Sequence, residues 1–307
     1  LWPNHFAVSR TMRVVTTAIR CPHKSLDFVT LRVKDAVCDR FREDCGERPD
    51  IDTRNPDVSV HVFLSESECT LYIDTSGQPL WQRGLRKASV DAPLKENLAA
   101  GILMLTGWQP GTPLIDPMCG SGTFLIEAAQ MALDIAPGLG RGFAFERLRN
   151  HDRGAWAALR RAAEQRRKPA RVLPIFGSDL VGEWVRRSRM NLDAAGLADC
   201  VRLDRADVLD RTPPADAGVM VANPPYGVRI GEAEDLLAFY PRLGDALKQR
   251  WGGWRCYLFS ADPELPKRIG LKATRRTPLF NGALECRLFE YRMVAGSNRE
   301  RAARAPE

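Results

Sequence analysis

The pattern of hydrophobic and polar positions divides the chain into two parts of different character. Up to residue 80, β-branched runs with period-two alternation predict strands over 11–19 and within 58–74. Between them, apolar residues about one turn apart predict an amphipathic helix over 25–44. This part of the sequence therefore indicates a small α+β domain over residues 1–80.

After residue 91 the pattern becomes a repeated alternation of strand and helix. Strands are predicted over 113–118, 171–179, 200–208, 218–225, 255–262 and 285–293, and helices over 92–108, 122–133, 182–195 and 234–251. Such alternation favours an α/β domain over 92–294, with a mostly parallel sheet and helices on both faces. A linker rich in Gly, Pro and charge is predicted over 81–91, and a disordered tail over 295–307.

Composition limits the class of protein. Of the 307 residues, 44% are hydrophobic and 27% are charged, and no apolar run approaches the length that crosses a bilayer, so we expect a soluble protein without a membrane partner. Eight cysteines without a CxxC pair argue against a zinc ribbon and a disulfide framework, and favour a cytoplasmic location. A net charge of +7 favours a polyanionic partner, although many basic proteins bind no nucleic acid.

The segment "DPMCGSGTF" (116–124) joins a predicted apolar strand directly to a helix. Ligands in open parallel sheets bind beyond the carboxyl ends of strands, which places Asp116 at such a position. Gly120 and Gly122 let the backbone approach a ligand, and the N–H groups of the following helix attract anions. The loop is neither a Walker A sequence nor G-x-G-x-x-G, because Leu125 stands third after Gly122. A carboxylate beside an anion-binding helix start suits a zwitterion such as the methionine part of S-adenosylmethionine; the alternative is a tight turn with a capping aspartate.

Two further carboxylates follow the next two predicted strands. Asp179 ends "FGSD", where a ribose diol finds its acceptor in such folds. It lies 63 residues after Asp116 (179 − 116) instead of the usual ~20, so an insertion is predicted over 135–170. Asp207 ends "LDRAD" and is predicted to accept a hydrogen bond from an adenine amino group. A lone aspartate is more often a helix cap, but the succession on three consecutive strands favours a cofactor site.

The stretch "NPPY" (223–226) ends a buried apolar strand, and it matches the [DNS]-PP-[YFW] motif of amino-methylating enzymes. With the sites upstream, the chain resembles that branch of the class I S-adenosylmethionine-dependent methyltransferases. A nucleobase amine is a poor nucleophile, because its lone pair is delocalised into the ring. The Asn223 side-chain oxygen and the rigidly held Pro224 carbonyl could accept its two N–H bonds and direct the lone pair at the methyl donor, while Tyr226 stacks on the extruded base. No metal is needed; the alternative is a strand-ending Pro-Pro turn.

A wider set of motifs is similar to the THUMP-domain methyltransferases that make N2-methylguanine in bacterial large-subunit rRNA. It comprises residues 83–108, "DPMCGSGTFLIEAA", "GSDL", "NPPYG", "LFNGALECRL" (279–288) and the THUMP-like "VKDAVCDRF" and "LYIDTSGQPLWQRG". The resemblance extends to about residue 293. It implies a seven-stranded, Rossmann-like methyltransferase domain after a smaller THUMP domain that binds RNA. Family members usually carry a ferredoxin-like segment before the THUMP domain, so an N-terminally shortened RNA-binding unit is expected here.

The residues and the resemblance together define the candidate site. The catalytic set is Asn223, Pro224, Pro225 and Tyr226. The set predicted to bind S-adenosylmethionine is Asp116, Met118, Gly120, Ser121, Gly122, Thr123, Asp179, Leu180, Asp207 and Lys95. The inclusion of Lys95 rests on the resemblance, in which the helix containing residues 92–95 lines the cofactor site. No metal ligands are predicted, because the four histidines have no metal spacing.

RNA contacts are predicted at Arg83, Arg86 and Lys87 on the linker, where phosphates could be bound, and the resemblance implies that the loop around Asn281 closes over the target. The resulting hypothesis is methyl transfer from S-adenosylmethionine to the N2 amine of a guanine in RNA, with 23S rRNA favoured. Guanine-N2 methylation of tRNA and adenine-N6 methylation of DNA or RNA stay open, since "NPPY" serves both bases. A non-catalytic RNA-binding assembly factor is the alternative from another class. The sequence gives no indication of the oligomeric state.

Overall fold

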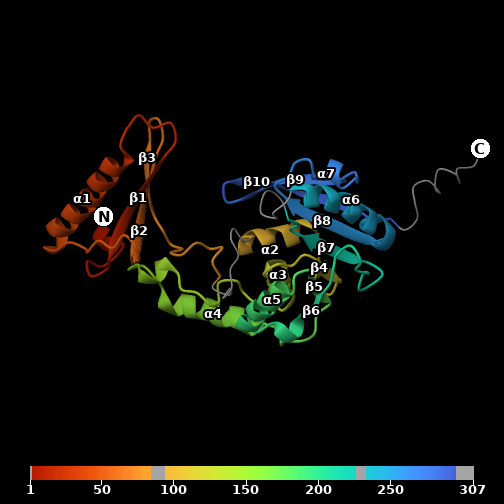
Figure 1. Ribbon diagram of the computed structural model, residues 1–307. Coiled ribbons are helices and arrows are strands. Elements are labelled where there is room, and N and C mark those ends of the chain that lie inside the picture. The colour runs from red at the N-terminus through yellow and green to blue at the C-terminus, as the bar shows by residue number, and fades with distance from the viewer. Residues whose placement is uncertain (1, 84–93, 226–232, 295–307) are drawn as a thin grey trace, which may run out of the picture. The chain divides into compact units, whose positions relative to one another are not determined.

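The computed structural model describes residues 2–83, 94–225 and 233–294 (Figure 1). Several predictions concern residues outside these ranges: Tyr226, Arg86, Lys87, most of the linker and the tail. None of the helices in the described ranges is long and apolar enough to span a membrane.

The chain forms two compact units, and the first of them is built from two separate segments. Unit 1 contains Leu1–Leu80 and Gly138–Gln165, and unit 2 contains Trp81–Pro137 and Arg166–Glu307. The predicted boundaries placed all of 92–294 in one domain. The structure instead assigns the middle of the predicted insertion to the N-terminal unit.

Unit 1 has a three-stranded sheet with one long helix packed on it. The elements are β1 (Met12–Ala18), α1 (Leu26–Cys45), β2 (Val58–Leu64) and β3 (Cys69–Ile73), with strand order β1-β2-β3. Strands β1 and β2 are parallel, whereas β2 and β3 are antiparallel. Helix α1 begins where the Ser25 side chain accepts the N–H of Phe28 and ends at Gly46, whose φ of 76° is left-handed. Its Val37 and Phe41 are fully buried with residues of β1 and β2.

The inserted segment belongs to unit 1 because its backbone is hydrogen-bonded to the N-terminal part of the chain. After the short helix η1 (Trp2–Asn4), the His5 carbonyl accepts the N–H of Arg149 over 2.8 Å, and the Thr75 carbonyl accepts the N–H of Phe145 over 3.1 Å. Phe145 belongs to the 3₁₀ helix η2 (Ala144–Arg147), and helix α4 (Arg153–Arg166) follows. The rings of Phe143 and Phe145 lie 5.5 and 4.9 Å from the ring of Trp156, which packs η2 against α4.

Unit 2 is an α/β domain with a seven-stranded sheet, in agreement with the predicted class. Its strand order is β6-β5-β4-β7-β8-β10-β9, and all pairs are parallel except those of β10 with β8 and β9. The strands are β4 (Leu114–Asp116), β5 (Ile175–Asp179), β6 (Arg202–Arg205), β7 (Gly218–Ala222), β8 (Trp254–Ser260), β9 (Arg275–Asn281) and β10 (Leu284–Arg292). Strand β9, which the pattern analysis missed, is an edge strand with arginine at its first two positions.

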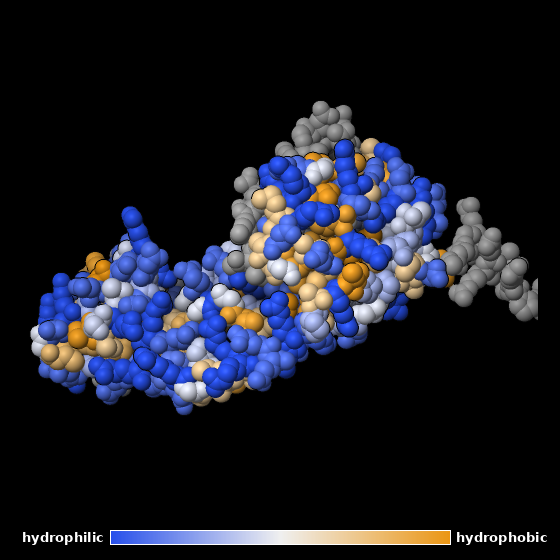
Figure 2. All heavy atoms as spheres, turned by 90° about the horizontal axis from the view of Figure 1, so that it is seen from below, coloured by the Kyte–Doolittle hydropathy of each residue, from blue (hydrophilic) through white to orange (hydrophobic). Residues whose placement is uncertain are grey.

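Helices cover both faces of this sheet. They are α2 (Glu96–Leu105), α3 (Thr123–Ala132), α5 (Gly182–Ala194), α6 (Ala233–Arg250) and α7 (Leu265–Arg268), with the 3₁₀ helix η3 (Ala198–Cys200). Side chains alternate between the faces, so that Leu114 packs with α2, α3 and α5 while the next residue, Ile115, packs with α6 and α7. On the visible face in Figure 2, hydrophilic residues predominate and the exposed apolar residues lie in patches between them.

Candidate active site

The loop between β4 and α3 is held in a conformation that only glycine fits well. Asp116, the last residue of β4, is 2% exposed, and its Oδ1 accepts the N–H of Met118 over 3.2 Å. Helix α3 starts directly after Gly122, which has a left-handed φ of 81°. A Cβ at Gly122 would come within 2.9 Å of Ser188 Oγ. A short glycine-containing loop therefore joins the buried carboxyl group of Asp116 to the first turn of α3.

Two polar side chains of α5, which sequence reasoning missed, donate hydrogen bonds to backbone carbonyls of this loop. Ser188 Oγ donates to the Gly120 carbonyl over 2.7 Å, and Asn191 Nδ2 donates to the Ser121 carbonyl over 3.0 Å. Both side chains are fully buried, although they belong to a helix with many charged residues. Their spacing of three residues on the apolar face of α5 was the available signal.

Asp179, the second predicted carboxylate, lies at the end of β5 and is hydrogen-bonded to the same loop. Its Oδ2 accepts the N–H of Gly120 over 3.0 Å, and its Oδ1 accepts the N–H of Val181 over 3.1 Å. Burial raises the pKa of Asp179. Burial also raises the pKa of Asp116 well above its ordinary value, and the charge of Asp179 adds to that effect. Neither carboxyl forms an ion pair with a cationic side chain among the described residues, so both lie at this edge of the sheet without a cation.

Asp207, the third predicted carboxylate, lies at the same edge of the sheet but in a turn. The N–H of Ala206 donates to the Asp179 carbonyl over 3.2 Å, which joins the two segments. Asp207 Oδ1 accepts the N–H of Leu209 over 2.9 Å. One carboxyl oxygen of Asp207 is therefore committed to the turn.

The corner after β7 contains a buried acceptor that has no donor among the residues described. Strand β7 lies next to β4, so Asn223 emerges at the edge where Asp116 lies. Asn223 Oδ1 is buried and accepts no hydrogen bond from any residue that the structure describes. Leaving such an atom unsatisfied costs about 1–3 kcal/mol, which calls for an explanation in function. Two residues on, the Pro225 carbonyl accepts the hydroxyl of Tyr240 over 2.6 Å, a contact that the sequence did not predict.

The two residues carried over from the family resemblance lie close together. Lys95 is the N-cap residue of α2, and its Nζ lies 5.4 Å from the ring centroid of Trp81. A Cβ at Gly282 would lie 3.7 Å from the same Nζ. Gly282 follows Asn281 in the turn between β9 and β10, so Lys95 and the loop of Asn281 are neighbours.

The remaining cofactor candidates differ in accessibility. Ser121 and Thr123 are buried, whereas Leu180 is 57% exposed and Met118 is partly buried.

The structure gives Arg83 partners that the sequence did not predict. Its guanidinium pairs with Glu127 over 2.6 Å, and the side chains are only 11% and 1% exposed. Its backbone N–H donates to Glu96 Oε2 over 2.7 Å. These two contacts link the described start of unit 2 to α2 and α3, and the RNA contact of Arg83 stays a prediction.

Comparison with known proteins identifies the family. The UPF0020 family, described as an RMKL-like methyltransferase domain, matches residues 83–290, and the THUMP domain matches residues 1–74. The chain belongs to the RMKL-like methyltransferase family. The resemblance and the fold class predicted from the motifs are thereby confirmed.

Relatives and solved structures similar to this chain can be aligned with nearly all of it. The ribosomal RNA large subunit methyltransferase K/L of Shewanella frigidimarina is 39% identical over 311 residues, which cover 100% of this chain but only 44% of that relative. The crystal structure of SMU.472 complexed with SAH (S-adenosylhomocysteine) has a TM-score of 0.86 at 29% identity, over 96% of this chain and 78% of that one. A predicted N6-adenine-specific DNA methylase from Listeria monocytogenes has a TM-score of 0.83 at 30% identity, over 95% and 76%.

Proposed function

We propose that this chain transfers a methyl group from S-adenosylmethionine to the exocyclic N2 amine of a guanine in RNA, with 23S rRNA as the substrate. The observation that carries the proposal is the buried Oδ1 of Asn223. It lacks a donor among the described residues and stands at the sheet edge shared with Asp116. An acceptor left open there suits the N–H of an incoming amine.

The chemistry of the neighbouring loop fits the cofactor. S-adenosylmethionine would supply an electrophilic methyl group on a positively charged sulfur. Asp116 offers a carboxylate without a cationic partner among the described residues, and the first turn of α3 offers N–H groups to an anion. Asp179 offers lone pairs to ribose hydroxyls while it holds Gly120. The ammonium group of the cofactor would thus meet a carboxylate, its carboxylate would meet N–H donors, and its ribose diol would meet a hydrogen-bond acceptor.

The corner of Asn223 would orient the amine. Asn223 Oδ1 and the Pro224 carbonyl would accept the two N–H bonds, which leaves the nitrogen lone pair facing the methyl donor. The same oxygens would stabilise the positive charge that develops on nitrogen as the bond forms. Alignment and charge stabilisation then replace the need for a strong base.

The nature of the substrate rests on the relatives. The name of the Shewanella protein supports large-subunit rRNA, and the THUMP match over residues 1–74 supports RNA over DNA. The chain spans less than half of that relative, so the activity of the longer protein is carried over as part of the proposal. The name of the Listeria structure keeps adenine N6 as the second candidate, because the same corner can accept either amine.

The test is direct identification of the product. The protein is incubated with S-adenosylmethionine labelled on its methyl group and with unmodified rRNA, tRNA or DNA, and each nucleic acid is digested to nucleosides. We expect label in N2-methylguanosine from 23S rRNA. Label in N6-methyladenine, or in tRNA alone, would overturn the assignment of guanine in 23S rRNA as the substrate. Cofactor binding without any transfer would favour the non-catalytic assembly role.

A further inference from the structure

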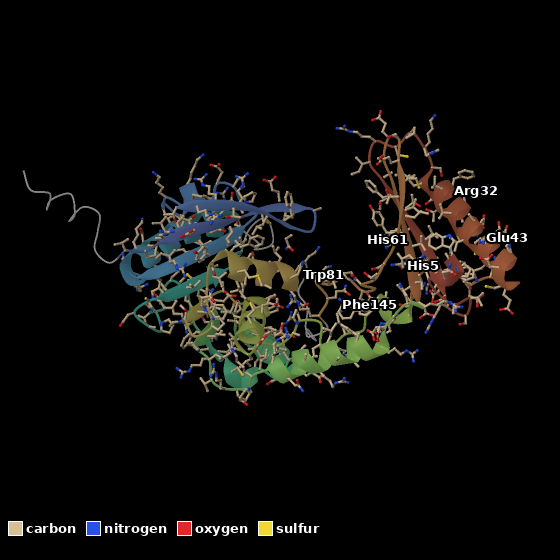
Figure 3. All side chains as sticks on the ribbon, turned by 180° about the vertical axis from the view of Figure 1, so that it is seen from behind. His5, Arg32, Glu43, His61, Trp81 and Phe145 are labelled. Carbon is tan, nitrogen blue, oxygen red and sulfur yellow. The ribbon has the colours of Figure 1, made fainter. Side chains whose placement is uncertain are left out.

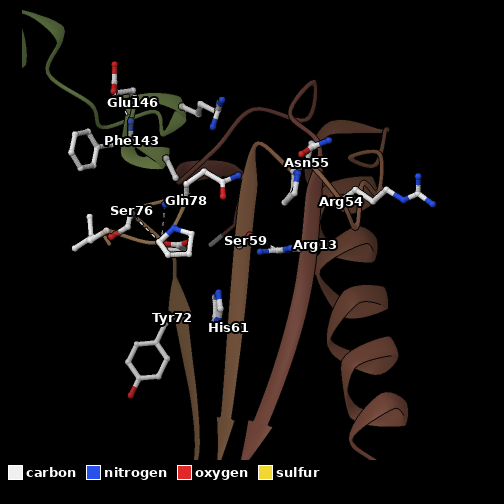
Figure 4. A pocket seen from close by; sticks show the side chains of 18 of the residues that line it. Arg13, Arg54, Asn55, Ser59, His61, Tyr72, Ser76, Gln78, Phe143 and Glu146 are labelled. Atoms are coloured by element: carbon white, nitrogen blue, oxygen red, sulfur yellow. Dashed lines mark hydrogen bonds between the residues drawn. The ribbon is translucent and has the colours of Figure 1, made fainter. Parts of the chain in front are cut away.

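A large cavity lies within unit 1, and none of its lining residues belongs to the set assigned to methyl transfer. Its volume is about 1250 Å³, and its lining comes from the three-stranded sheet, the turn after β3 and the inserted segment (Figure 4). The sheet contributes Arg13, Ser59, His61 and Tyr72. Helix η2 and its N-cap residue Phe143 contribute a rim that also includes Glu146 and Arg147. The volume exceeds the roughly 300–1,000 Å³ of ordinary small-molecule sites, which favours an extended ligand.

The cavity floor is the face of the sheet that α1 does not cover. Side chains alternate along β2, where Val60 and Val62 are fully buried and His61 between them is partly exposed. Figure 3 shows His61 on one side of the sheet and α1, with Arg32, on the other. His61 is paired with Tyr72 across the β2–β3 ladder, so an imidazole and a phenol ring lie side by side on this open face.

Among the charged residues that line the cavity, one arginine is exposed, whereas the carboxylates accept hydrogen bonds from backbone N–H groups. Arg54 is exposed and forms no ion pair among the described residues. Arg13 is held in place, because its Nε donates to Ser59 Oγ over 2.9 Å. Asp74 Oδ1 accepts the N–H of Ser76 over 2.8 Å. Glu146 Oε1 accepts the N–H of Phe143 over 2.7 Å. The carboxylates therefore stabilise turns, and the positive charge of the arginines favours an anionic ligand.

We propose that this open face, with η2 as its rim, binds an unpaired stretch of RNA. Tyr72 and His61 stack on successive bases, and Arg13 and Arg54 face the phosphates. A sheet face with planar side chains is a surface on which unpaired bases stack, whereas paired bases in a duplex have no free faces. The inference rests on the proposed function for the choice of RNA as substrate, and it goes further by assigning the binding site and the single-stranded form.

The alternatives fit the same residues less well. An acidic peptide would pair with Arg54 but would leave the Tyr72 and His61 rings without flat partners. Duplex RNA would meet the arginines through its phosphates but could not stack on the rings. Tyr72, which is 53% exposed, is therefore the residue that distinguishes unpaired RNA from other anionic ligands.

The test uses the whole chain and a fluorescent oligouridylate of about eight nucleotides, with binding followed by anisotropy. Uracil has no exocyclic amine, so the probe does not supply the group that the Asn223 corner would bind. We expect Tyr72→Ala to weaken binding by at least about fivefold, because one stacked base is lost. Arg54→Ala should weaken binding and reduce the slope of log K against log salt by about 0.7, the value for one phosphate contact on a single strand.

Matched controls are available on α1, on the other side of the sheet. Phe28 is 62% exposed, so Phe28→Ala removes an equally accessible ring. Arg32 is exposed, so Arg32→Ala removes the same charge as Arg54→Ala. Neither control should change binding by more than about twofold. Equal losses in the controls, unchanged binding in Tyr72→Ala, or tighter binding of a duplex of the same length would each overturn the proposal.

The outcome is independent of methyl transfer. If the protein methylates rRNA but Tyr72→Ala binds oligouridylate normally, the assignment of this face is wrong and the proposed function stands. If Tyr72→Ala loses binding while the unmodified protein transfers no methyl group, the RNA site stands and the enzymatic proposal is wrong.

Discussion

The hydroxyl of Tyr240 donates a hydrogen bond to the carbonyl oxygen of Pro225 over 2.6 Å, and this contact ties helix α6 to the end of the NPP segment. Tyr240 is 1% exposed, so the bond is sheltered from water. Proline fixes its own φ and restricts the residue before it to extended conformations, which limits the backbone freedom of Asn223 and Pro224. With Pro225 held as well, the direction of the Pro224 carbonyl is set by few remaining degrees of freedom.

Tyr240→Phe should therefore reduce methyl transfer without loss of the cofactor. We expect kcat to fall by about three- to tenfold, since one hydrogen bond contributes about 0.5–1.5 kcal/mol to positioning. The dissociation constant of S-adenosylmethionine, measured by calorimetry, should stay within about twofold.

A matched control is Tyr257→Phe, which also removes a buried hydroxyl. Tyr257 donates to the Thr106 carbonyl, at the C-terminal end of α2, over 3.2 Å, and not to the NPP segment. An equal fall of kcat in both variants would show that Tyr240 acts only through general stability.

Asn223→Ala should remove most methyl transfer and leave cofactor affinity nearly unchanged. We expect kcat to fall about 10²–10³-fold, the size of effect seen when one charge-stabilising group is removed from an active site. Because Asn223 Oδ1 lacks a donor among the described residues, its removal should leave the melting temperature unchanged or raise it. Loss of transfer together with cofactor affinity would show that Asn223 is misplaced in the mechanism.

The placement of the candidate residues at the ends of strands could be predicted because the signals are local. Asp116 and Asp179 end their strands and Asn223 directly follows one, and parallel strands bring such ends to one edge of the sheet. The glycine requirement at Gly122 is equally local, because it follows from a left-handed turn before a helix. Turn chemistry of this kind is written in consecutive residues.

The contacts that the sequence did not reveal join distant segments. Arg83 looked like a free linker cation, but its partner Glu127 lies 44 residues away on α3. Tyr240 gave no signal, because only the fold brings α6 to Pro225. The packing of η2 against the turn after β3 likewise depends on single long-range bonds, such as that from the Phe145 N–H to the Thr75 carbonyl. Spacing rules describe one element at a time and carry no information on such pairs.

Asp179→Ala should mainly weaken cofactor binding. The change removes a carboxylate that accepts N–H groups of Gly120 and Val181 and faces the proposed ribose position. We expect the dissociation constant of S-adenosylmethionine to rise by at least about tenfold, which is ~1.4 kcal/mol. Asp179→Asn, which retains one acceptor oxygen, should show a smaller rise. An unchanged dissociation constant in Asp179→Ala would refute the assignment.

Asp116 should couple cofactor binding to pH and to stability. Burial raises its pKa, so the folded protein holds this proton more tightly than the unfolded chain does. As pH rises above the ordinary pKa of an aspartate, ionisation of Asp116 therefore costs stability, whereas the proposed cationic ligand needs the ionised form. Cofactor affinity should fall as pH is lowered through the raised pKa.

Asp116→Asn separates the two effects. The amide oxygen can still accept the N–H of Met118, but no charge is left to desolvate. At neutral pH we expect calorimetry to show a melting transition at least about 2 °C higher without cofactor, and cofactor affinity lower by more than about tenfold. A lower melting temperature would mean that Asp116 is stabilised by a partner and is not held ready for a ligand.

Arg141 should govern the rim of the cavity in unit 1 that is proposed to bind RNA. Its guanidinium donates to the backbone carbonyls of Ser76 over 2.9 Å and of Pro79 over 3.0 Å, and to that of Gln78, and it lies 4.9 Å from the ring centroid of Phe143. A planar group with five donors can bridge several carbonyls at once, which the single ammonium of lysine cannot reproduce.

Arg141→Ala should therefore loosen η2 on the turn after β3. We expect hydrogen exchange of the Phe145 amide, which donates to Thr75, to become about tenfold faster, while the Arg149 amide, which donates to His5, keeps its rate. Arg141→Lys retains the charge and should show most of the same acceleration. If Arg141→Lys behaves like the unmodified protein, the charge alone matters and the carbonyl network does not hold the rim. If both amides accelerate equally in Arg141→Ala, the whole inserted segment has detached and the local role is wrong.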